Sequence, residues 1–414
     1  MTFTDAVRFL EQTLGTTRIS LGLTRMRRML AELGDPQKAF RIIHVAGTNG
    51  KGSVSAMLTS VLTHSGIRTG MYISPHLSSV TERISIDTIS ITSRSFAALT
   101  SRLRPLFLRH GATYFEALTV MALLHFKEQK VDLAVVEVGL GGRLDATNMC
   151  DAMLAIITNI SLEHTDWLGH DLASIANEKA GIIKPGQRVL TGTLGVARQV
   201  IRRVAADKGA VLLSLPRIQR PKGGALAIGN HHDLHLGLRG KFQEDNARLV
   251  IGAIDWLRTQ GFRIPPENVR KGLEHVRWPG RMEQGTNILL DCAHNLTGAK
   301  ALAGEIRSSG KNIILVIGIL DDKDYQGMIR AFMGMSSLVI LTAPQSIRAI
   351  MPSELEKLFI GKSIQHTIEK TIPSALRRAY HELNEQKKDT IILVTGSCYT
   401  VGEARTYLQK KGLL

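Results

Sequence analysis

Apolar residues follow two alternating patterns along residues 40 to 200. Continuous apolar runs, such as those at 131–138 and 152–159, are typical of buried strands. Between them, apolar residues recur at helical spacing, as in the strongly apolar segment 114–127. The residues before 40 carry helical patterns interrupted by Gly15 and by Gly34-Asp35-Pro36. Strands that alternate with helices predict an α/β fold with a mostly parallel sheet covered by helices.

The same alternation restarts after Trp278-Pro279-Gly280-Arg281, a sequence typical of an interdomain hinge. The chain has 414 residues, which is more than a single hydrophobic core usually spans. We therefore predict a larger domain over residues 1–278 and a smaller, Rossmann-like domain over residues 279–414. The strands predicted in the second domain are 288–291, 313–319, 338–342 and 391–395.

The segment from Arg41 to Ser53 predicts a strand, a glycine-rich turn and a helix. Such a turn leaves backbone N–H groups free at a helix N-terminus, and Lys51 adds a full positive charge, so a phosphate of ATP is the expected ligand. The usual P-loop pattern fails at two places, because Val45 replaces its first glycine and Gly52 replaces the hydroxyl residue after the lysine. A glycine-rich turn without a ligand is the alternative. The candidate ATP-binding residues are Thr48, Asn49, Gly50, Lys51, Gly52 and Ser53.

Polar residues follow several predicted strands at the edge where open α/β sheets bind ligands. Ser74 follows the short strand at 70–73, and Glu137 lies near the end of the apolar run 131–138. A buried carboxylate needs a partner, so Glu137 is either an ordinary strand-end residue or a magnesium ligand next to the phosphates. His164 follows the next strand and either completes a magnesium site or caps a turn.

The formal net charge of +16 and the pI near 9.9 indicate acidic partners, which include nucleotides, polycarboxylates and nucleic acid. Lys and Arg residues are scattered without a basic tail, and aromatic residues make up only 5% of the chain. Few stacking platforms are therefore available, which argues against nucleic acid. A nucleic-acid-binding P-loop protein remains the alternative from another class.

Three cysteines, Cys150, Cys292 and Cys398, lie far apart and indicate neither a disulfide framework nor a zinc site. His231, His232 and His235 have loose metal-ligand spacing without a framing Cys or carboxylate, so we interpret them as surface residues. The N-terminus resembles an amphipathic helix and no apolar run reaches membrane-spanning length. A protein of a reducing cytoplasm, without membrane partners, is expected.

Many motifs in fixed order give the chain a close resemblance to the folylpolyglutamate synthase and dihydrofolate synthase family of the Mur ligase superfamily. The resemblance runs from about Leu21 to Arg405, and the family also carries glycine at the position of Gly52. It rests on segments 44–53, 74–77 with 82–84, 115–116, 137–148, 164–169, 175–184, 279–281, 291–295 and 396–397.

This resemblance implies a Mur-ligase-like fold and an ATP-dependent ligase with one or two magnesium ions. The implied activity joins L-glutamate to dihydropteroate, and to the γ-carboxylate of reduced folates and folylpolyglutamates, with the C-terminal domain closing over ATP and glutamate. Lys179 matches the lysine that this superfamily carbamylates, and Lys51, Lys179 and His294 are the candidate catalytic residues. His294 either stabilises the reaction or merely braces its loop.

The remaining implied site residues fall into three groups. The ATP site gains Asn246, Arg281 and Asp291. The pteroate site comprises Gly22, Leu23, Thr24, Arg25, Phe115, Glu116, Ala117, Leu118, Leu144, Asp145 and Ala146. The magnesium ligands are Ser74, Glu137 and His164.

Two enzyme alternatives stay open at this point. A monofunctional folylpolyglutamate synthase would use only reduced folates, and a cell-wall Mur ligase would apply the same chemistry to a UDP-linked substrate. The segment Gly22–Arg25 and the pair Phe115-Glu116 argue against the cell-wall ligase. A monomer is expected, and the positive charge suits anionic folates and their growing γ-glutamyl tail.

Overall fold

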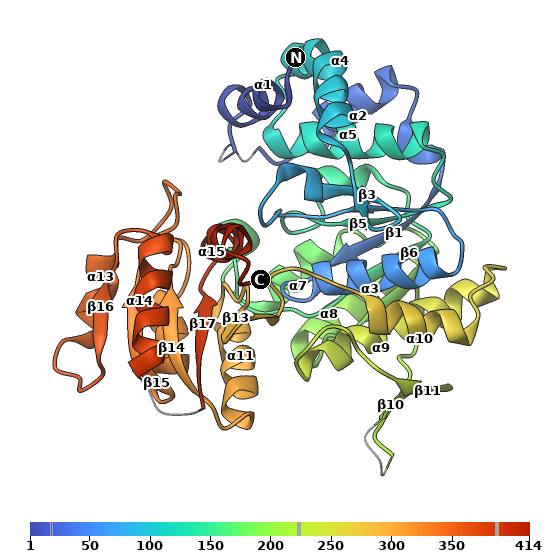
Figure 1. Ribbon diagram of the computed structural model, residues 1–414. Coiled ribbons are helices and arrows are strands. Elements are labelled where there is room, and N and C mark those ends of the chain that lie inside the picture. The colour runs from blue at the N-terminus through green and yellow to red at the C-terminus, as the bar shows by residue number, and fades with distance from the viewer. Residues whose placement is uncertain (17, 19, 222–224, 386–388) are drawn as a thin grey trace. The chain divides into compact units, whose positions relative to one another are not determined.

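The computed structural model describes residues 1–414 except 17, 19, 222–224 and 386–388. It divides the chain into two compact units (Figure 1). The first unit contains residues 1–237 and 243–277, and the second contains residues 238–242 and 278–414. The short stretch 238–242 thus belongs with the C-terminal residues, an arrangement that no sequence pattern indicated.

The first unit is built on a sheet with the strand order β4-β3-β2-β5-β1-β6-β7-β8. Neighbouring strands pair in parallel along the part β2-β5-β1-β6-β7-β8 of this order. At one edge of the sheet, β3 pairs antiparallel with both β2 and β4. The strands are β1 (Arg41–Ala46), β2 (Thr69–Tyr72), β3 (Ile84–Ile86), β4 (Ile89–Ser90), β5 (Leu133–Glu137), β6 (Leu154–Ile157), β7 (Arg188–Thr191) and β8 (Val211–Leu212). The predicted mostly parallel sheet is confirmed.

Helices cover this sheet on both faces (Figure 1). The helices α1, α2, α4 and α5 share one core with the strands, while α3 packs on β2, β5 and β1 and against α10. The helices are α1 (Phe3–Arg8), α2 (Thr24–Glu32), α3 (Lys51–His64), α4 (Ser93–His110), α5 (Tyr114–Glu128), α6 (Thr165–Leu168), α7 (Leu172–Ala180), α8 (Gly195–Asp207), α9 (Phe242–Thr259) and α10 (Pro266–His275). The α5 helix begins at a capping box, in which Thr113 and Glu116 each bond the other's backbone N–H.

A small separate sheet, with the order β11-β10-β9, contains Ile218–Gln219 (β9), Leu226–Ile228 (β10) and His231–Leu234 (β11). The interpretation of His231 as a surface residue is wrong, because its side chain is buried. Its Nε2 atom lies 2.8 Å from Oδ1 of Asp255 on α9, a carboxylate 24 positions away in sequence. His232 and His235 are exposed, as predicted.

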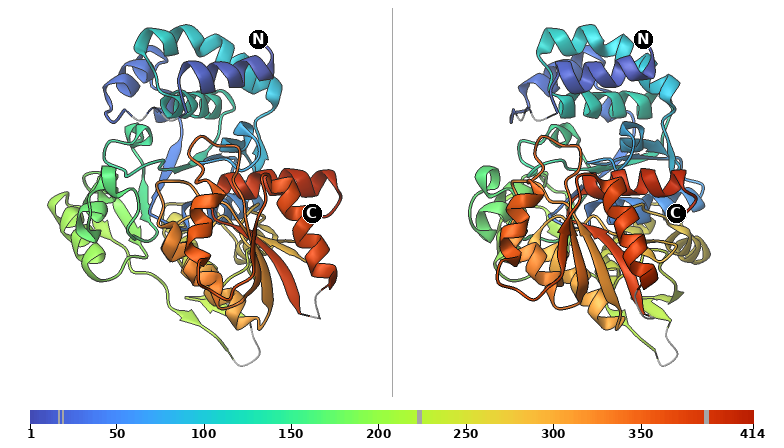
Figure 2. Two further views of the ribbon diagram at one scale, coloured as in Figure 1. Left: turned by 90° about the vertical axis from the view of Figure 1, so that its left-hand side faces the viewer. Right: turned by 60° about the vertical axis from the view of Figure 1, so that its left-hand side comes forward.

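The second unit has the strand order β12-β13-β17-β14-β15-β16, with all neighbours parallel except β12 and β13. Its strands are β12 (Glu283–Gly285), β13 (Ile288–Leu290), β14 (Asn312–Ile317), β15 (Ser336–Leu341), β16 (His366–Ile368) and β17 (Thr390–Thr395). Its helices are α11 (Leu296–Ser308), α12 (Tyr325–Met333), α13 (Pro352–Glu356), α14 (Ile372–Glu385) and α15 (Cys398–Lys410). The helices α11 and α12 form a core with one face of the sheet, while α14 and α15 pack together on its strands (Figure 2).

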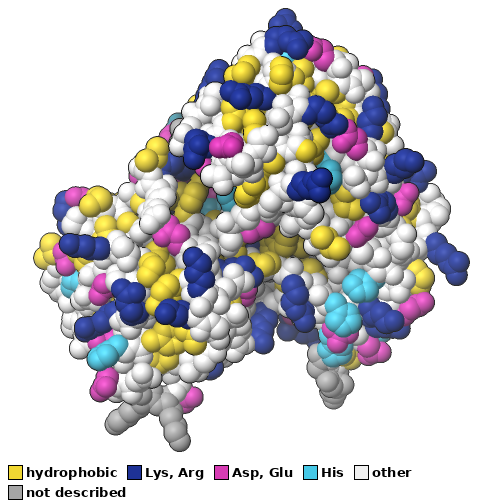
Figure 3. Space-filling view, turned by 45° about the horizontal axis from the view of Figure 1, so that its top comes forward, with side chains coloured by type: hydrophobic (Ala, Val, Ile, Leu, Met, Phe, Trp, Pro, Cys, Tyr) yellow, Lys and Arg dark blue, Asp and Glu magenta, His cyan; other side chains and the backbone are white. Residues whose placement is uncertain are grey.

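Lys and Arg side chains on the face shown in Figure 3 are interspersed with acidic and apolar groups. They form no continuous basic strip on that face, which agrees with the scattered basic residues of the sequence. Among the residues that the structure describes, no helix combines the length and the apolar content that crossing a membrane requires.

Candidate functional site

The loop between β1 and α3 is anchored to the chain just beyond β6. Thr48 N donates to Asn159 O at 2.8 Å, and Asn49 N donates to Asn159 Oδ1 at 2.9 Å. Thr158 Oγ1 donates in turn to Asn49 O at 2.6 Å. Thr158 and Asn159 were not among the predicted site residues, although both lie at the end of the predicted strand 152–159, at the ligand-binding edge. These bonds hold the loop against the chain beyond β6.

Lys51 is the first residue of α3, which runs for 14 residues. Its Nζ atom donates to Gly47 O at 3.1 Å and to Thr48 O at 3.0 Å, so the ammonium lies over its own loop. A helix N-terminus carries partial positive charge and unbonded N–H groups. Together with the Lys51 cation, this arrangement is chemically suited to bind the phosphates of a nucleotide.

Asn246 on α9 lies directly against the phosphate loop. Gly50 has φ of +87°, and a Cβ atom placed there would lie 2.4 Å from Asn246 Oδ1. Asn246 Nδ2 donates to Gln243 Oε1 at 2.8 Å, and Gln243 Nε2 donates to Ser53 Oγ at 3.3 Å. The structure therefore brings three predicted ATP-site residues together. Gln243 was not among the predicted ATP-site residues, and it lies in the first turn of α9, which begins at Phe242.

Lys179 is buried at the end of α7, and its Nζ atom donates to Gly47 O at 2.9 Å. Two lysine side chains thus share one carbonyl oxygen of the phosphate loop. Burial, together with the positive charge of Lys51, lowers the pKa of Lys179 to about 7, against the opposing effect of the charges of Glu163 and Asp145. A substantial fraction of the Lys179 amine is therefore neutral near neutral pH.

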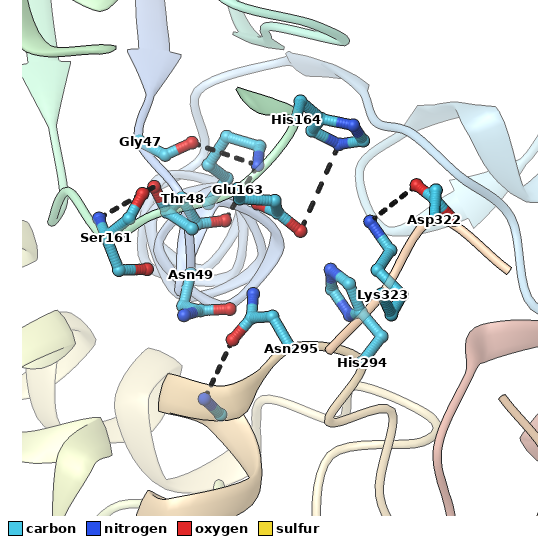
Figure 4. A network of polar contacts seen from close by, with 12 residues as sticks. Gly47, Thr48, Asn49, Ser161, Glu163, His164, His294, Asn295, Asp322 and Lys323 are labelled. Atoms are coloured by element: carbon cyan, nitrogen blue, oxygen red, sulfur yellow. Dashed lines mark hydrogen bonds and ion pairs between the residues drawn. The ribbon is translucent and has the colours of Figure 1, made fainter. Parts of the chain in front are cut away.

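The three candidate magnesium ligands follow neighbouring strands of the sheet. Glu137 ends β5, is buried, and pairs in register with Val45 of β1, which leads into the phosphate loop. Ser74 follows β2, which pairs with β5, and His164 follows β6, which pairs with β1. His164 has φ of +52° at the start of α6, and its Nε2 lies 4.0 Å from Glu163 Oε1 (Figure 4).

A divalent ion fits the chemistry of these groups. A buried carboxylate beside a phosphate loop, with a hydroxyl and an imidazole on adjacent strand ends, offers ligands that magnesium accepts. Among the described residues, no cluster of three or more His, Cys, Asp or Glu side chains is arranged to hold a metal ion alone. Magnesium commonly keeps water and phosphate oxygens as ligands, so a sparse protein contribution is expected.

The predicted pteroate-contacting residues Arg25 and Glu116 form an ion pair. Arg25 Nε donates to both carboxylate oxygens of Glu116 at 3.0 Å, and its Nη2 donates to Ser20 O at 2.7 Å. Glu116 is buried, whereas the Arg25 side chain is 27% exposed. The pair joins the first turn of α2 to the first turn of α5, and so connects the segments Gly22–Arg25 and Phe115–Leu118.

Asp145, another predicted substrate contact, is engaged by its own loop. One carboxylate oxygen accepts from Gly139 N and Leu140 N, at 3.1 and 2.8 Å, and the other accepts from Thr147 N at 2.9 Å. Burial raises the pKa of Asp145, while these hydrogen bonds lower it. A Cβ atom on Gly139 would lie 2.4 Å from the ring of Phe115, so this loop packs on α5. Leu144 and Ala146 adjoin the same carboxylate in sequence.

In the second unit, the carboxylate of Asp291 accepts from the backbone N–H of Met282 and of Ala293, each at 2.9 Å. Burial raises the pKa of Asp291, and the nearby Arg281 guanidinium opposes that shift. His294 Nδ1 lies 2.8 Å from Cys292 O within the same loop. The loop ends at Asn295, which caps α11 by accepting from Gly298 N at 2.8 Å.

Comparison with family models assigns both parts of the chain to Mur ligases. Residues 45–254 match the Mur ligase middle domain, and residues 278–398 match the Mur ligase glutamate ligase domain.

Curated relatives resemble the chain over nearly its whole length. The chain is 34% identical to the dihydrofolate synthase/folylpolyglutamate synthase of Bacillus subtilis, over 94% of this chain and 95% of the relative. It is 32% identical to the folylpolyglutamate synthase of Lacticaseibacillus casei, over 93% of this chain and 94% of the relative.

Solved structures show the same similarity. The Mycobacterium tuberculosis folylpolyglutamate synthase complexed with ADP has a TM-score of 0.89 and 32% identity, over 98% of this chain and 97% of that chain. Escherichia coli FolC in complex with DHPP and ADP has a TM-score of 0.89 and 30% identity, over 100% and 99%. A bifunctional folylpolyglutamate synthase/dihydrofolate synthase with Mn, AMPPNP and L-glutamate bound has a TM-score of 0.85 and 29% identity, over 99% of both chains. The chain therefore belongs to the dihydrofolate synthase/folylpolyglutamate synthase family of Mur ligases.

Proposed function

We propose that the chain is an ATP-dependent ligase that joins L-glutamate to dihydropteroate and to the γ-carboxylate of reduced folates and folylpolyglutamates. The observation that carries this proposal is the anchored phosphate loop, with Lys51 at the start of α3 and Asn246 against Gly50. The family assignment supports it, because relatives over the full length carry both synthase names.

The chemistry requires an activated carboxylate. A free carboxylate acylates amines poorly, because oxide would be its leaving group. Transfer of the γ-phosphoryl group of ATP produces an acyl phosphate, from which phosphate leaves when the amine of glutamate attacks. Positioning and charge neutralisation dominate phosphoryl transfer, and Lys51 supplies a cation at the loop that binds the phosphates. A relative complexed with ADP and another with AMPPNP bound support a nucleotide as a ligand of this chain.

Ser74, Glu137 and His164 would hold magnesium. The ion supplies charge neutralisation at the phosphate oxygens, and the manganese-bound relative supports a divalent site. The role of Glu137 in this assignment is to present a buried anion at the strand beside β1. Glu163, next to His164 and also buried, is a further anionic group near the same strand ends.

Lys179 would carry a carbamate formed from its amine and CO2. Carbamylation requires a neutral amine, and burial together with the Lys51 charge lowers the pKa of Lys179 to about 7. The product is an oxygen anion, which relieves the repulsion between two buried amines at Gly47 O. Protein incubated with ¹³C-labelled bicarbonate should show a carbamate carbon by NMR, and Lys179→Ala should lack it. Short carboxylates should restore activity to Lys179→Ala. Absence of a labelled carbamate carbon in the wild-type protein would contradict this role.

The pteroate group would be bound by the segments that Arg25 and Glu116 connect, together with the loop around Asp145. The E. coli relative in complex with DHPP supports a substrate of this kind. In the second unit, Arg281 and Asp291 are proposed ATP contacts and His294 a proposed stabilising residue. A monomer that does not bind nucleic acid remains part of the proposal.

The proposal is tested by supplying purified protein with ATP, magnesium, L-glutamate and dihydropteroate. We expect phosphate release that depends on all four components, and dihydrofolate as the product identified by mass. Turnover of reduced folates without turnover of dihydropteroate would make the chain a monofunctional folylpolyglutamate synthase. Phosphate release at the same rate with and without dihydropteroate or a reduced folate would contradict the proposal.

A further inference from the structure

Two cysteines that lie far apart in sequence meet in the second unit. Cys292 follows β13 and Cys398 follows β17, and these two strands pair in parallel. The chain segments stay together past the strand ends, because Gly396 N donates to Ala293 O at 3.2 Å and Thr395 Oγ1 approaches the same oxygen at 3.4 Å. The chain segments that carry the two cysteines therefore lie next to each other.

The side chains of Cys292 and Cys398 are close enough for each to shift the pKa of the other, and His294 also lowers the pKa of Cys398. Cys292 is buried, with 3% of its surface exposed, whereas Cys398 is partly exposed. Solvent-borne reagents can therefore reach one member of the pair.

The environment shifts the pKa values of the two thiols in opposite directions. Cys398 is the first residue of α15, a 13-residue helix capped by Ser397, and a helix N-terminus stabilises a thiolate. The neighbouring Cys292 side chain holds the pKa of Cys398 well below its ordinary value, and His294 adds to this effect. The Cys398 side chain raises the pKa of Cys292, which keeps its proton. Cys398, whose pKa is lowered, is therefore the more reactive thiol of the pair, and Cys292 is placed to act as the resolving thiol.

A metal does not explain the cluster. Soft ligands such as two cysteines and a histidine would suit zinc. Within the described part of the chain, however, no group of three such side chains has an arrangement that could hold an ion. Neither cysteine has a role in the proposed ligase chemistry.

We propose that Cys398 and Cys292 form a reversible disulfide when the protein meets hydrogen peroxide. The Cys398 thiolate attacks one peroxide oxygen, the O–O bond breaks, and hydroxide leaves, which gives a sulfenic acid. The Cys292 sulfur then attacks the Cys398 sulfur, the S–O bond breaks, and the hydroxyl group leaves with the Cys292 proton as water. Two electrons pass from the two sulfurs to the peroxide, and a small dithiol reverses the bond by thiol exchange.

The disulfide would alter the loop that carries two proposed functional residues. It would tie the loop Asp291–Asn295 covalently to the start of α15 and remove the thiolate whose pKa His294 lowers. This consequence rests on the proposed function, because Asp291 and His294 are proposed to act in the ATP-dependent reaction. We expect the oxidised protein to turn over at least tenfold more slowly, with full recovery after reduction.

The first test measures the bond itself, independently of activity. The full chain is treated with hydrogen peroxide, free thiols are alkylated, and the digest is analysed by mass spectrometry. We expect a cross-linked peptide containing Cys292 and Cys398, with Cys150 still alkylated after unfolding. Burial in the first unit raises the pKa of Cys150 to about 12, so this cysteine is the internal control. Alkylation of all three cysteines after oxidation would overturn the proposal.

The second test compares variants. Cys398→Ser and Cys292→Ser should each lose the peroxide sensitivity, while Cys150→Ser should keep it. Equal loss of activity in Cys398→Ser and wild type under peroxide would show that another group is oxidised, and would overturn the regulatory role. A cross-linked chain whose turnover is unchanged would also overturn that role. Absence of turnover before any oxidation would instead refute the proposed function. The disulfide itself would then be tested by the cross-linked peptide alone.

Discussion

Gly50→Ala tests the conclusion that Asn246 and the phosphate loop form one unit. Gly50 has φ of +87°, which L-residues rarely adopt, and an added Cβ would lie 2.4 Å from Asn246 Oδ1 and 3.2 Å from its Cγ. The substitution therefore strains the loop backbone and also displaces the side chain of Asn246. That side chain donates to Gln243 Oε1 at 2.8 Å, so its displacement disturbs a buried network.

Gly66→Ala provides a matched control at the other end of α3. Gly66 has φ of +75°, and nothing lies within 4 Å of the position of its Cβ. Alanine in a left-handed conformation costs about 1–2 kcal/mol at either site. Only Gly50→Ala adds the displacement of Asn246, which costs about 1 kcal/mol more for each hydrogen bond that is lost. We expect Gly50→Ala to lower the free energy of unfolding by about 2–3 kcal/mol and Gly66→Ala by about 1–2 kcal/mol.

The assay combines urea unfolding with the KM for ATP. Loss of one nucleotide contact worth about 1.4 kcal/mol raises the KM of Gly50→Ala about tenfold, whereas Gly66→Ala should keep the wild-type KM. In the Asn246→Ala background, where the clashing atoms are absent, Gly50→Ala should cost no more stability than Gly66→Ala does. Equal stability loss in the two single variants, together with an unchanged KM in Gly50→Ala, would refute the contact between loop and helix.

Three further expectations follow from the first unit. Arg25→Ala should cost about 2–3 kcal/mol of stability, because it leaves the buried Glu116 carboxylate without its cation, and it should raise the KM for dihydropteroate. Arg28 is exposed, so Arg28→Ala should change neither the stability nor this KM. Equal effects of the two substitutions would contradict the pairing of Arg25 with Glu116. For Lys179, whose folded pKa is about 7 against an ordinary value of 10.5, the unfolded chain binds the extra proton between these values. Stability in CO2-free buffer should therefore rise between about pH 7.5 and pH 9.5 by up to about 2.7 kcal/mol, and a Lys179→Met variant with the same pH dependence would count against this burial effect. Glu137→Gln should raise the magnesium concentration needed for half-maximal turnover, and an unchanged titration would return Glu137 to a structural role.

The sequence predicted the elements that carry strong local patterns. The strand β1 and the helix α3 were expected because apolar runs and glycine-rich turns act over a few residues. Asn246 was assigned to the ATP site only through the family resemblance, and its contact with Gly50 depends on how α9 packs. Periodicity alone does not contain that information.

Contacts across large sequence separations were the ones that the sequence did not indicate. His231 was interpreted as exposed because its carboxylate partner, Asp255, lies on another element. The proximity of Cys292 and Cys398 arises from the pairing of β13 with β17, two strands that lie far apart in the sequence of the second unit. Asp145 was expected to contact substrate, and its bonds to its own loop follow from a backbone conformation that residue identity does not specify.

Isotope transfer tests the proposed acyl-phosphate chemistry most directly. Dihydropteroate labelled with ¹⁸O in its carboxylate is incubated with the protein, ATP, magnesium and L-glutamate, and the released phosphate is analysed by mass spectrometry. Because the γ-phosphoryl group is transferred to the carboxylate, we expect one ¹⁸O atom in each phosphate released. Product formation with unlabelled phosphate would contradict the proposed activation of the carboxylate by ATP.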